Sequence, residues 1–327
     1  MTLLYTSPIF LEHETGNHPE KSERLRRITR HLEGTQLLDQ CTKPSIEPVS
    51  LERLSRVHKP EYVDEVKEFA ANHPGYIEAD TVISPRSYDV ATRAAGAGCD
   101  AVARILKGES KNALCLVRPP GHHALEKSAM GFCLFNNIAV AARTATKEFG
   151  LDRVLIVDWD VHHGNGTQDA FWEDPQVAFF SIHRYPFYPG TGTSDEVGAG
   201  KARDTKLNLP VKYGTSRKDY LARFKTELEA FADRLKPQLV FISAGFDAHA
   251  LDPIGSLGLE VEDFTELTRI VQQVANTHAS GRVLSMLEGG YNVDILPLCV
   301  ETHLRELLAQ TQEEDRENAK VRNREKE

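Results

Sequence analysis

The chain has 327 residues, of which 40% are hydrophobic and 27% are charged, and its formal net charge is −9. This composition is ordinary for a globular protein, and the length allows one large α/β domain or two average ones. The negative charge argues against a nucleic-acid-binding surface, which needs clustered Lys and Arg. No run of 18 apolar residues occurs, so no membrane span is expected.

The cysteines are scattered along the chain, odd in number and without a CxxC pair: Cys41, Cys99, Cys115, Cys133 and Cys299. Neither a disulfide framework nor a cysteine zinc cluster is expected from this spacing. The first residues also lack the basic segment and apolar core of a secretory signal. We therefore expect the protein to work in a reducing compartment, the cytoplasm.

Apolar segments alternate with helical patterns along most of the chain. Buried parallel strands are predicted at residues 113–117, 154–157, 177–182, 239–243 and 283–287. Apolar residues at three- and four-residue spacing predict helices at about 87–107, 136–149, 217–235 and 261–279. These patterns predict a single α/β domain over residues 1–310. Residues 311–327 are almost wholly polar and charged, which is typical of a solvated helix end or a disordered tail.

Each predicted strand leads into Gly, His, Asp or Tyr residues. The segment after the strand at 154–157 holds the largest number of acids and histidines. It contains Asp158, Asp160 and His162, which would point to one side of an extended chain. Uncompensated buried charge costs at least several kcal/mol, so a partner is required. Carboxylate and imidazole on one side predict half of a first-row metal site, with zinc the leading ion. The alternative is a capped strand end with surface histidines.

A catalytic zinc ion needs a third protein ligand, and Asp247 is the best candidate. It follows the strand at 239–243 in a Gly-Phe-Asp turn. Ligand sites in open α/β sheets collect beyond the carboxyl ends of the strands, so these groups are expected to meet. Zinc there would lower the pKa of a bound water and polarise a carbonyl group. The alternative is that Asp247 caps the next helix.

Two further strand ends carry groups suited to proton transfer and oxyanion binding. His122 and His123 follow a rigid Pro-Pro-Gly turn, and histidine titrates near working pH. Asp158 and Asn165 are candidate partners, and because only one is charged the two histidines need not share a pKa. Tyr291 follows two glycines and could offer its phenol to a developing oxyanion. Polar loop histidines and a tyrosine that only packs are the alternatives.

These motifs together resemble the zinc-dependent histone deacetylase family, most closely its class II and bacterial deacetylase-like branch. The resemblance is carried, in order, by RPPGHH (118–123), GFCLFNNIAVAA (131–142), DWDVHHGNGTQ (158–168), FISAGFDAH (241–249) and LEGGYN (287–292). An early loop at 13–24 and the segment 80–96 also match. The resemblance covers roughly residues 1–310, and motifs in this order are far more specific than any one alone.

The resemblance implies the arginase–deacetylase fold, a mostly parallel sheet of about eight strands between helices, and hydrolysis of an acyl-amide such as acetyl-lysine. It implies that Asp160, His162 and Asp247 bind the zinc. It assigns His123 as general base and later general acid, and Tyr291 as the group that polarises the carbonyl. His122 is implied as the electrostatic neighbour of His123, paired with Asp158, whereas Asn165 faces the second histidine.

Further implied positions concern the substrate tunnel and a potassium ion. Gly131 and Phe132 match its floor and one wall, and Tyr188 falls where the opposite wall is usually phenylalanine. Arg24 resembles the arginine of an exit channel for the released acid. Potassium is implied at Asp158, Ser181 and Ile182 with the backbone of Asp160 and His162.

The substrate stays open between acetylated lysine in a peptide or protein and a small acylated amine such as an acetylpolyamine. Ile254 stands where a polyamine-selective relative carries a glutamate, which counts against polyamines, although Asp252 and Glu14 are nearby acids. A non-catalytic acyl-lysine binding module is disfavoured by the intact set of site residues. An arginase-like enzyme with two manganese ions is disfavoured by Tyr291 and the Pro-Pro-Gly-His-His turn.

Overall fold

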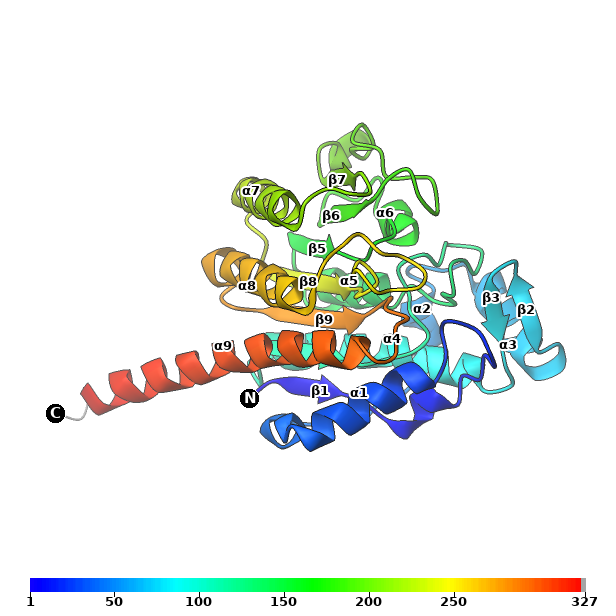
Figure 1. The fold of residues 1–327 in the computed structure, drawn as a ribbon, viewed down its shortest axis with the longest axis horizontal. Coiled ribbons are helices and arrows are strands. Elements are labelled where there is room, and N and C mark those ends of the chain that lie inside the picture. Colours follow the sequence, from blue (N-terminus) through cyan, green and yellow to red (C-terminus); the bar gives the residue numbers. More distant parts are fainter. Residues whose placement is uncertain (325–327) are drawn as a thin grey trace.

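The computed structural model describes residues 1–324, with side chains described to Gln310 (Figure 1). Seven strands form one sheet in the order β1-β4-β9-β8-β5-β6-β7. Every neighbouring pair is parallel. Their bounds are β1 (Leu3–Tyr5), β4 (Asn112–Cys115), β5 (Val154–Asp158), β6 (Val177–Arg184), β7 (Lys206–Val211), β8 (Leu239–Ala244) and β9 (Val283–Leu287).

Helices cover both faces of this sheet. The helices α1, α9, α8 and α7 pack side by side on one face, and α4 packs against α5 on the other (Figure 1). Their bounds are α1 (Glu23–Gly34), α4 (Ser87–Leu106), α5 (Asn137–Glu148), α7 (Arg217–Leu235), α8 (Val261–His278) and α9 (Leu296–Arg324). The shorter elements α2 (Leu51–Leu54), α3 (Pro60–Asn72) and α6 (Asn165–Ala170) and the antiparallel hairpin of β2 (Gly75–Glu78) and β3 (Thr81–Ile83) lie beside this core.

Local sequence explains why these elements begin where they do. The Asn136 side chain caps α5 by accepting a hydrogen bond from the Ala139 N–H (3.0 Å), and Ser216 caps α7 in the same way (3.1 Å). The central strand β5 is buried at all five positions, as expected for a parallel strand covered on both faces. The apolar runs therefore become interior strands, and the amphipathic runs become the covering helices.

The predicted α/β fold is confirmed, with differences of one or two residues at most element ends. The sheet has seven strands where about eight were expected. Two of the seven were not predicted, because β1 has only three residues and β7 contains Pro210 and the polar Asn208. The polar segment after residue 310 continues α9 as far as Arg324, whereas residues 325–327 lie outside the described part.

The parallel arrangement brings the carboxyl ends of all seven strands to one edge. Since β4, β9, β8 and β5 are adjacent in the sheet, the motifs that follow them become neighbours in space. All five cysteines are free thiols. Within residues 1–324, no helix combines the length and apolar character needed to cross a bilayer.

Candidate active site

Three side chains from two strand ends meet at one buried point. The His162 Nδ1 lies 3.0 Å from Asp160 Oδ1 and 3.1 Å from Asp247 Oδ2. One donor atom from each residue lies within 4.8 Å of the others, and all three side chains are buried. Among the residues that the structure describes, this is the one group of His, Cys, Asp and Glu with such spacing. The sequence-predicted metal ligands therefore come together.

The chain reaches this arrangement by turning, not by extending. Strand β5 ends at Asp158, whose Oδ1 accepts a hydrogen bond from the Asp160 N–H (3.1 Å). Asp160 Oδ1 in turn accepts one from the His162 N–H (2.9 Å). Each of the two aspartates thus accepts a hydrogen bond from the N–H two residues later, which turns the chain out of the extended conformation. The expectation that alternation in an extended strand aligns these residues is therefore wrong. The alternative of surface histidines is also wrong, since His162 and His163 are buried.

Asp247 does not cap a helix. Its Oδ1 accepts a hydrogen bond from the Val161 N–H (2.9 Å), so it binds the turn that follows β5. The next helix, α8, begins 14 residues later with Glu260 at its N-cap. Asp247 is thus tied to the Asp160–His162 turn at the point where the metal is predicted.

Glycine at position 289 lets the backbone after β9 reach the two carboxylates. The Gly289 N–H donates to Asp160 Oδ2 (2.9 Å). A Cβ atom on Gly289 would lie 2.3 Å from Asp247 Oδ2 and 2.5 Å from Asp160 Oδ2, distances at which atoms overlap. Any larger residue would displace the predicted ligands.

The donor set fits a divalent cation. Burial, followed by the charge of Asp160, raises the pKa of Asp247 to about 7. Two carboxylates in so dry a place carry more negative charge than one imidazole can balance. Two oxygens and a nitrogen in this arrangement are typical ligands of zinc. The cluster is therefore suited to one zinc ion.

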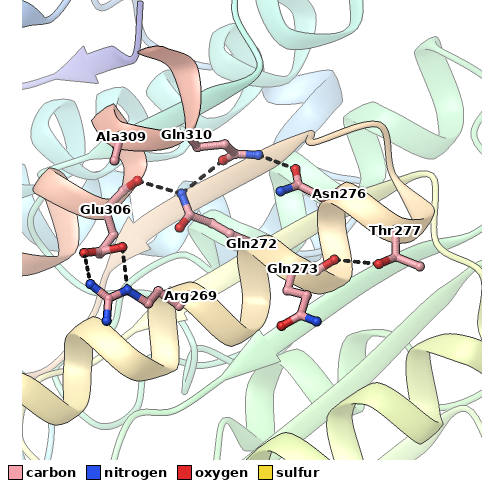
Figure 2. Close-up of a pocket in the computed structure, with 8 residues that line it drawn as sticks. All are labelled: Arg269, Gln272, Gln273, Asn276, Thr277, Glu306, Ala309 and Gln310. Carbon is pink, nitrogen blue, oxygen red and sulfur yellow. Dashed lines mark hydrogen bonds and ion pairs between the residues drawn. The ribbon is translucent and has the colours of Figure 1, made fainter. Parts of the chain in front are cut away.

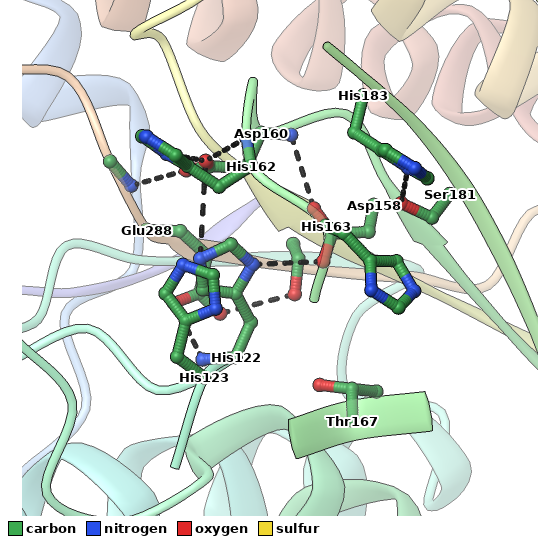
Figure 3. A network of polar contacts seen from close by, with 12 residues as sticks. His122, His123, Asp158, Asp160, His162, His163, Thr167, Ser181, His183 and Glu288 are labelled. Atoms are coloured by element: carbon green, nitrogen blue, oxygen red, sulfur yellow. Dashed lines mark hydrogen bonds and ion pairs between the residues drawn. The ribbon is translucent and has the colours of Figure 1, made fainter. Parts of the chain in front are cut away.

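The tandem histidines make two different contacts, and Figure 3 shows the one between His122 and Asp158. The His122 Nδ1 lies 3.0 Å from Asp158 Oδ2, whereas the His123 Nδ1 lies 2.7 Å from Asn165 Oδ1. Burial alone would lower the pKa of His122, but the adjacent carboxylates, Asp158 foremost, raise it to about 10. Burial and the positive charges of His122 and His162 lower the pKa of His123 well below its usual value. The pair thus combines a cation with a neutral imidazole.

Tyr291 projects into the same space from the turn after β9. Its ring meets Phe132 edge to face, with ring centroids 5.6 Å apart. Its N–H donates to Asp252 Oδ2 (2.7 Å), which fixes the turn. Burial raises the pKa of the Tyr291 phenol well above the usual value, so the phenol keeps its proton. A protonated phenol can donate a hydrogen bond to an oxyanion.

A pocket of about 230 Å³, called the tunnel below, is bordered by His123, His162 and Tyr291. It is lined by Asp80, His123, Gly131, Phe132, His162, Phe187, Tyr188, Ile254 and Tyr291. The backbone of Gly131 (φ 57°) lies against His123. A Cβ atom at this position would therefore lie 2.3 Å from the imidazole Cδ2. The three predicted tunnel residues Gly131, Phe132 and Tyr188 all lie on its wall.

Arg24 does not line the tunnel. It is fully buried, and its guanidinium donates to the backbone oxygens of Gly290 (2.6 Å) and Glu288 (2.5 Å). It also pairs with Glu20 (3.2 Å) and lies 5.0 Å from the centre of the Tyr291 ring. Arg24 therefore supports the turn that carries Tyr291.

The residues named for potassium lie beside the metal cluster, Asp158 at the end of β5 and Ser181 and Ile182 on the adjacent strand β6. Asp158 and Ser181 are partners in the register of β5 and β6, and Ile182 follows on β6. All three are buried. The Ser181 hydroxyl lies 2.9 Å from His183 Nδ1 (Figure 3). The residues are thus neighbours, although no cation is needed to explain these contacts.

Sequence reasoning missed four residues that shape the site. Glu288 Oε2 accepts the Gly121 N–H (2.7 Å) and thereby ties β9 to the histidine turn. Asp252 was noted only as a nearby acid, and it anchors Tyr291. The Phe187 ring stacks on His162, with centroids 5.3 Å apart, and Asp80 lines the tunnel. Glu288 directly precedes the Gly-Gly-Tyr motif, which could have marked it.

Comparison with known proteins adds an independent observation. A model of the histone deacetylase domain matches residues 18–307. The chain is 36% identical over 293 residues to the histone deacetylase-like amidohydrolase of Pseudomonas aeruginosa, covering 89% of this chain and 77% of that protein. It is 41% identical over 289 residues to the polyamine deacetylase HDAC10 of Homo sapiens, covering 85% of this chain and 43% of that protein.

Comparison with solved structures leads to the same family. The crystal structure of the HDA15 HD domain superimposes with a TM-score of 0.88 at 36% identity, covering 95% of this chain and 90% of that chain. The match to the family model, residues 18–307, contains every strand end that contributes to the site.

Proposed function

The chain belongs to the histone deacetylase family and is an amidohydrolase of the deacetylase type, and we propose that it removes acetyl or related acyl groups from amines at the end of a slender chain. The observation that carries this proposal is that His162 of the Asp160–His162–Asp247 cluster, His123 and Tyr291 line the same tunnel. The leading substrate is acetylated lysine in a peptide or protein.

Asp160, His162 and Asp247 would hold one zinc ion, and their charge and burial support this assignment. When bound, zinc supplies Lewis-acid polarisation of the acyl carbonyl and a lowered pKa for water. The described residues offer one such cluster, which favours a single catalytic metal over a two-manganese site. A potassium ion at Asp158, Ser181 and Ile182, with the backbone of Asp160 and His162, is a further part of the proposal.

His123 is the general base and then the general acid. The Asn165 oxygen accepts a hydrogen bond, so the Nδ1 of His123 carries the proton and the Nε2 is free to accept another. The low pKa keeps the imidazole neutral before reaction. His123 would take the proton from the attacking water and return it to the leaving amine. His122, kept cationic by Asp158, would stabilise the negative charge that develops beside it.

Tyr291 donates the hydrogen bond to the oxygen that becomes negative. Its high pKa keeps the donor proton in place, and Asp252 holds its backbone. The ring contact with Phe132 and the backbone bond to Asp252 would position the hydroxyl before the charge develops, which is the condition for efficient oxyanion stabilisation. The presence of Tyr291 supports a catalytic role over an acyl-lysine binding module.

A small acylated amine is the second candidate substrate. Asp80 places a carboxylate on the tunnel wall, and a carboxylate there would attract the distant ammonium groups of an acetylpolyamine. The human relative is named a polyamine deacetylase. Against this, the rim position Ile254 is apolar. A reducing compartment, the cytoplasm, fits the free thiols.

The test is the value of kcat/KM on an acetyl-lysine peptide and on acetylated spermidine, measured side by side with the zinc-loaded protein. Hydrolysis of both with a higher value for the peptide supports the leading proposal, and the reverse order supports the second candidate. The Asp247→Ala variant is the control and should lose both the metal and the activity. Zinc-loaded wild-type protein that hydrolyses neither amide would refute the proposed function.

A further inference from the structure

The end of β6 and the turn after β7 bring an arginine and a tyrosine together at the carboxyl edge of the sheet. Arg184 and Val211 are partners in the register of these parallel strands, so the chain beyond Val211 continues beside Arg184. A turn follows, closed by a hydrogen bond from the Thr215 N–H to the Lys212 oxygen (3.1 Å). The turn places the centre of the Tyr213 ring 4.7 Å from the guanidinium carbon of Arg184.

Arg184 also contacts the wall of the tunnel. Its guanidinium carbon lies 4.1 Å from the centre of the Phe187 ring, and Phe187 lines the tunnel. Its Nη1 donates a hydrogen bond to the Gly255 oxygen (2.9 Å), and its backbone N–H donates one to the Val161 oxygen (2.8 Å). Arg184 is therefore held in place and joins two aromatic rings. The three side chains of Phe187, Arg184 and Tyr213 are called the aromatic ledge below.

The outer end of the aromatic ledge is accessible to a ligand. Tyr213 is 68% exposed, whereas Phe187 is half-buried. A tyrosine ring offers a large contact area and loses little conformational entropy on binding, and this ring already rests on Arg184. The two contact distances place the Phe187 and Tyr213 ring centres no more than about 9 Å apart, which an extended peptide spans in two or three residues at about 3.3–3.6 Å each.

We propose that the aromatic ledge binds the side chain that lies two or three residues from the acetylated lysine of a peptide substrate, and that it favours an aromatic side chain there. The proposal rests on the proposed function, because it requires that the acetylated side chain enters the tunnel beside Phe187. An aromatic side chain would pack on Tyr213 in the offset or edge-to-face arrangement that such pairs prefer. The charge of Arg184 repels the ammonium groups of a polyamine, so the ledge favours peptides.

The test compares acetyl-lysine peptides that differ at one position. One peptide has glycine at every flanking position, and four others carry a single phenylalanine two or three residues before or after the acetyl-lysine. In the wild type, phenylalanine at one of these positions should raise kcat/KM by roughly three- to tenfold, the scale of one aromatic pair. Tyr213→Ala should abolish this preference, whereas Tyr213→Phe keeps the ring and should retain it.

Two controls separate the aromatic ledge from a general loss of activity. Tyr213→Ala should hydrolyse the all-glycine peptide and acetylated spermidine within about twofold of the wild type, because neither carries a side chain that the ring could bind. Tyr76→Ala removes a tyrosine that is equally exposed (66%) but lies on β2, outside the ledge, and the preference for phenylalanine should persist.

Peptide binding gives a second readout that needs no turnover. Fluorescence anisotropy with the labelled phenylalanine peptide should show a Kd roughly three- to tenfold higher for His123→Ala/Tyr213→Ala than for His123→Ala alone. Hydrolysis of the all-glycine peptide without a phenylalanine preference at any of the four positions would overturn the aromatic ledge. So would a preference that survives Tyr213→Ala or is lost in Tyr76→Ala, or equal Kd values. A wild-type protein that hydrolyses none of the amides would instead refute the proposed function, and with it the ledge as a substrate-binding surface.

Discussion

The two ends of the parallel sheet both bury polar side chains, but they satisfy them in different ways. At the carboxyl ends of the strands the buried groups are charged, and carboxylates face imidazoles across about 3 Å (Figure 3). At the opposite end, α8 and α9 border an open cavity whose two buried side chains, Gln272 and Gln310, are neutral amides (Figure 2). There Gln272, Gln310 and Asn276 bond to one another over 2.7–3.0 Å.

This difference shows that neither the volume of a cavity nor the polarity of its lining identifies the functional end of the sheet. The α8–α9 cavity measures about 550 Å³, more than twice the volume of the tunnel. Its amides have found partners within the fold, so they need nothing from outside. At the carboxyl ends, Asp160 and Asp247 are buried against each other, and burial followed by the charge of Asp160 raises the pKa of Asp247 to about 7, an arrangement typical of a functional site. Unbalanced buried charge is therefore the better guide to chemistry here.

Replacing His123 should cause the largest loss of activity at the carboxyl ends of the strands. His123→Ala removes the group that both accepts and returns the proton, and turnover should fall by roughly 10²–10⁴. The metal should stay bound, because His123 is not among the three ligands. Stopped-flow or steady-state rates, together with metal analysis, measure both effects. Near-normal turnover with bound zinc would remove His123 from the mechanism.

Tyr291→Phe should have the next largest effect. The variant keeps the ring contact with Phe132 and loses only the phenolic donor, so kcat should fall by roughly 10²–10³, the scale of one oxyanion donor. The value of KM should change much less, since the donor acts mainly in the transition state. A rise in KM with unchanged kcat would show that the phenol binds substrate and does not stabilise the oxyanion.

The sequence predicts the charged end well because its signals are local. Asp160, His162 and Asp247 directly follow apolar strands, and a parallel sheet brings such strand ends together. The pairing of His122 with Asp158 and of His123 with Asn165 agrees with the candidate partners proposed from the sequence. The tunnel residue Tyr188 was placed only by resemblance.

What the sequence does not predict are contacts between distant segments. Glu288 reaches Gly121 across 167 positions, and Arg24 reaches Gly290 across 266. Neither contact leaves a periodic or spacing signal, because each depends on how strands are ordered in the sheet. The role of Asp80 was hidden for a further reason. It lies on a short hairpin outside the main sheet, where no strand end marks it.

Lys206 is a buried ionisable side chain at the amino end of β7, away from the site. Its ammonium donates to the Val177 carbonyl (3.0 Å) and the Thr205 hydroxyl (2.7 Å), and burial lowers its pKa from 10.5 to about 7. Between these values the unfolded chain binds more protons than the folded one, so stability should rise with pH. The slope is at most about 1.4 kcal/mol per pH unit, and hydrogen bonds to the ammonium reduce it.

Lys206→Met should remove that slope. The free energy of unfolding from urea titrations at pH 7, 8 and 9, expressed as wild type minus variant, should increase across the series. The change of this difference with pH is the test. Its absolute value is not, because the variant also leaves a carbonyl without its donor, which changes the free energy of unfolding at every pH. Lys201→Met, at an exposed lysine, is the control and should leave the slope as in the wild type. Parallel curves for wild type and Lys206→Met would show that the ammonium stays charged in the fold.

Gln310 tests whether the amide end contributes only to stability. Its side chain bonds to Asn276 (2.7 Å), the Gly281 oxygen (3.1 Å) and Gln272 (3.0 Å). Gln310→Ala leaves these groups without their partner, which should lower the free energy of unfolding by about 1–3 kcal/mol. Gln273→Ala, an exposed glutamine on the same cavity, should change it by less than about 0.5 kcal/mol.

Turnover should distinguish the two ends even where stability does not. The Gln310→Ala variant is assayed well below its melting temperature. Its kcat/KM on the acetyl-lysine peptide should stay within about twofold of the wild type, because none of the residues that line the α8–α9 cavity also lines the tunnel. A tenfold loss of kcat/KM in the folded variant would mean that the α8–α9 cavity is coupled to the tunnel. The amides of the α8–α9 cavity would then contribute to catalysis as well as to stability. Buried unbalanced charge would then not be enough to identify the functional end of the sheet.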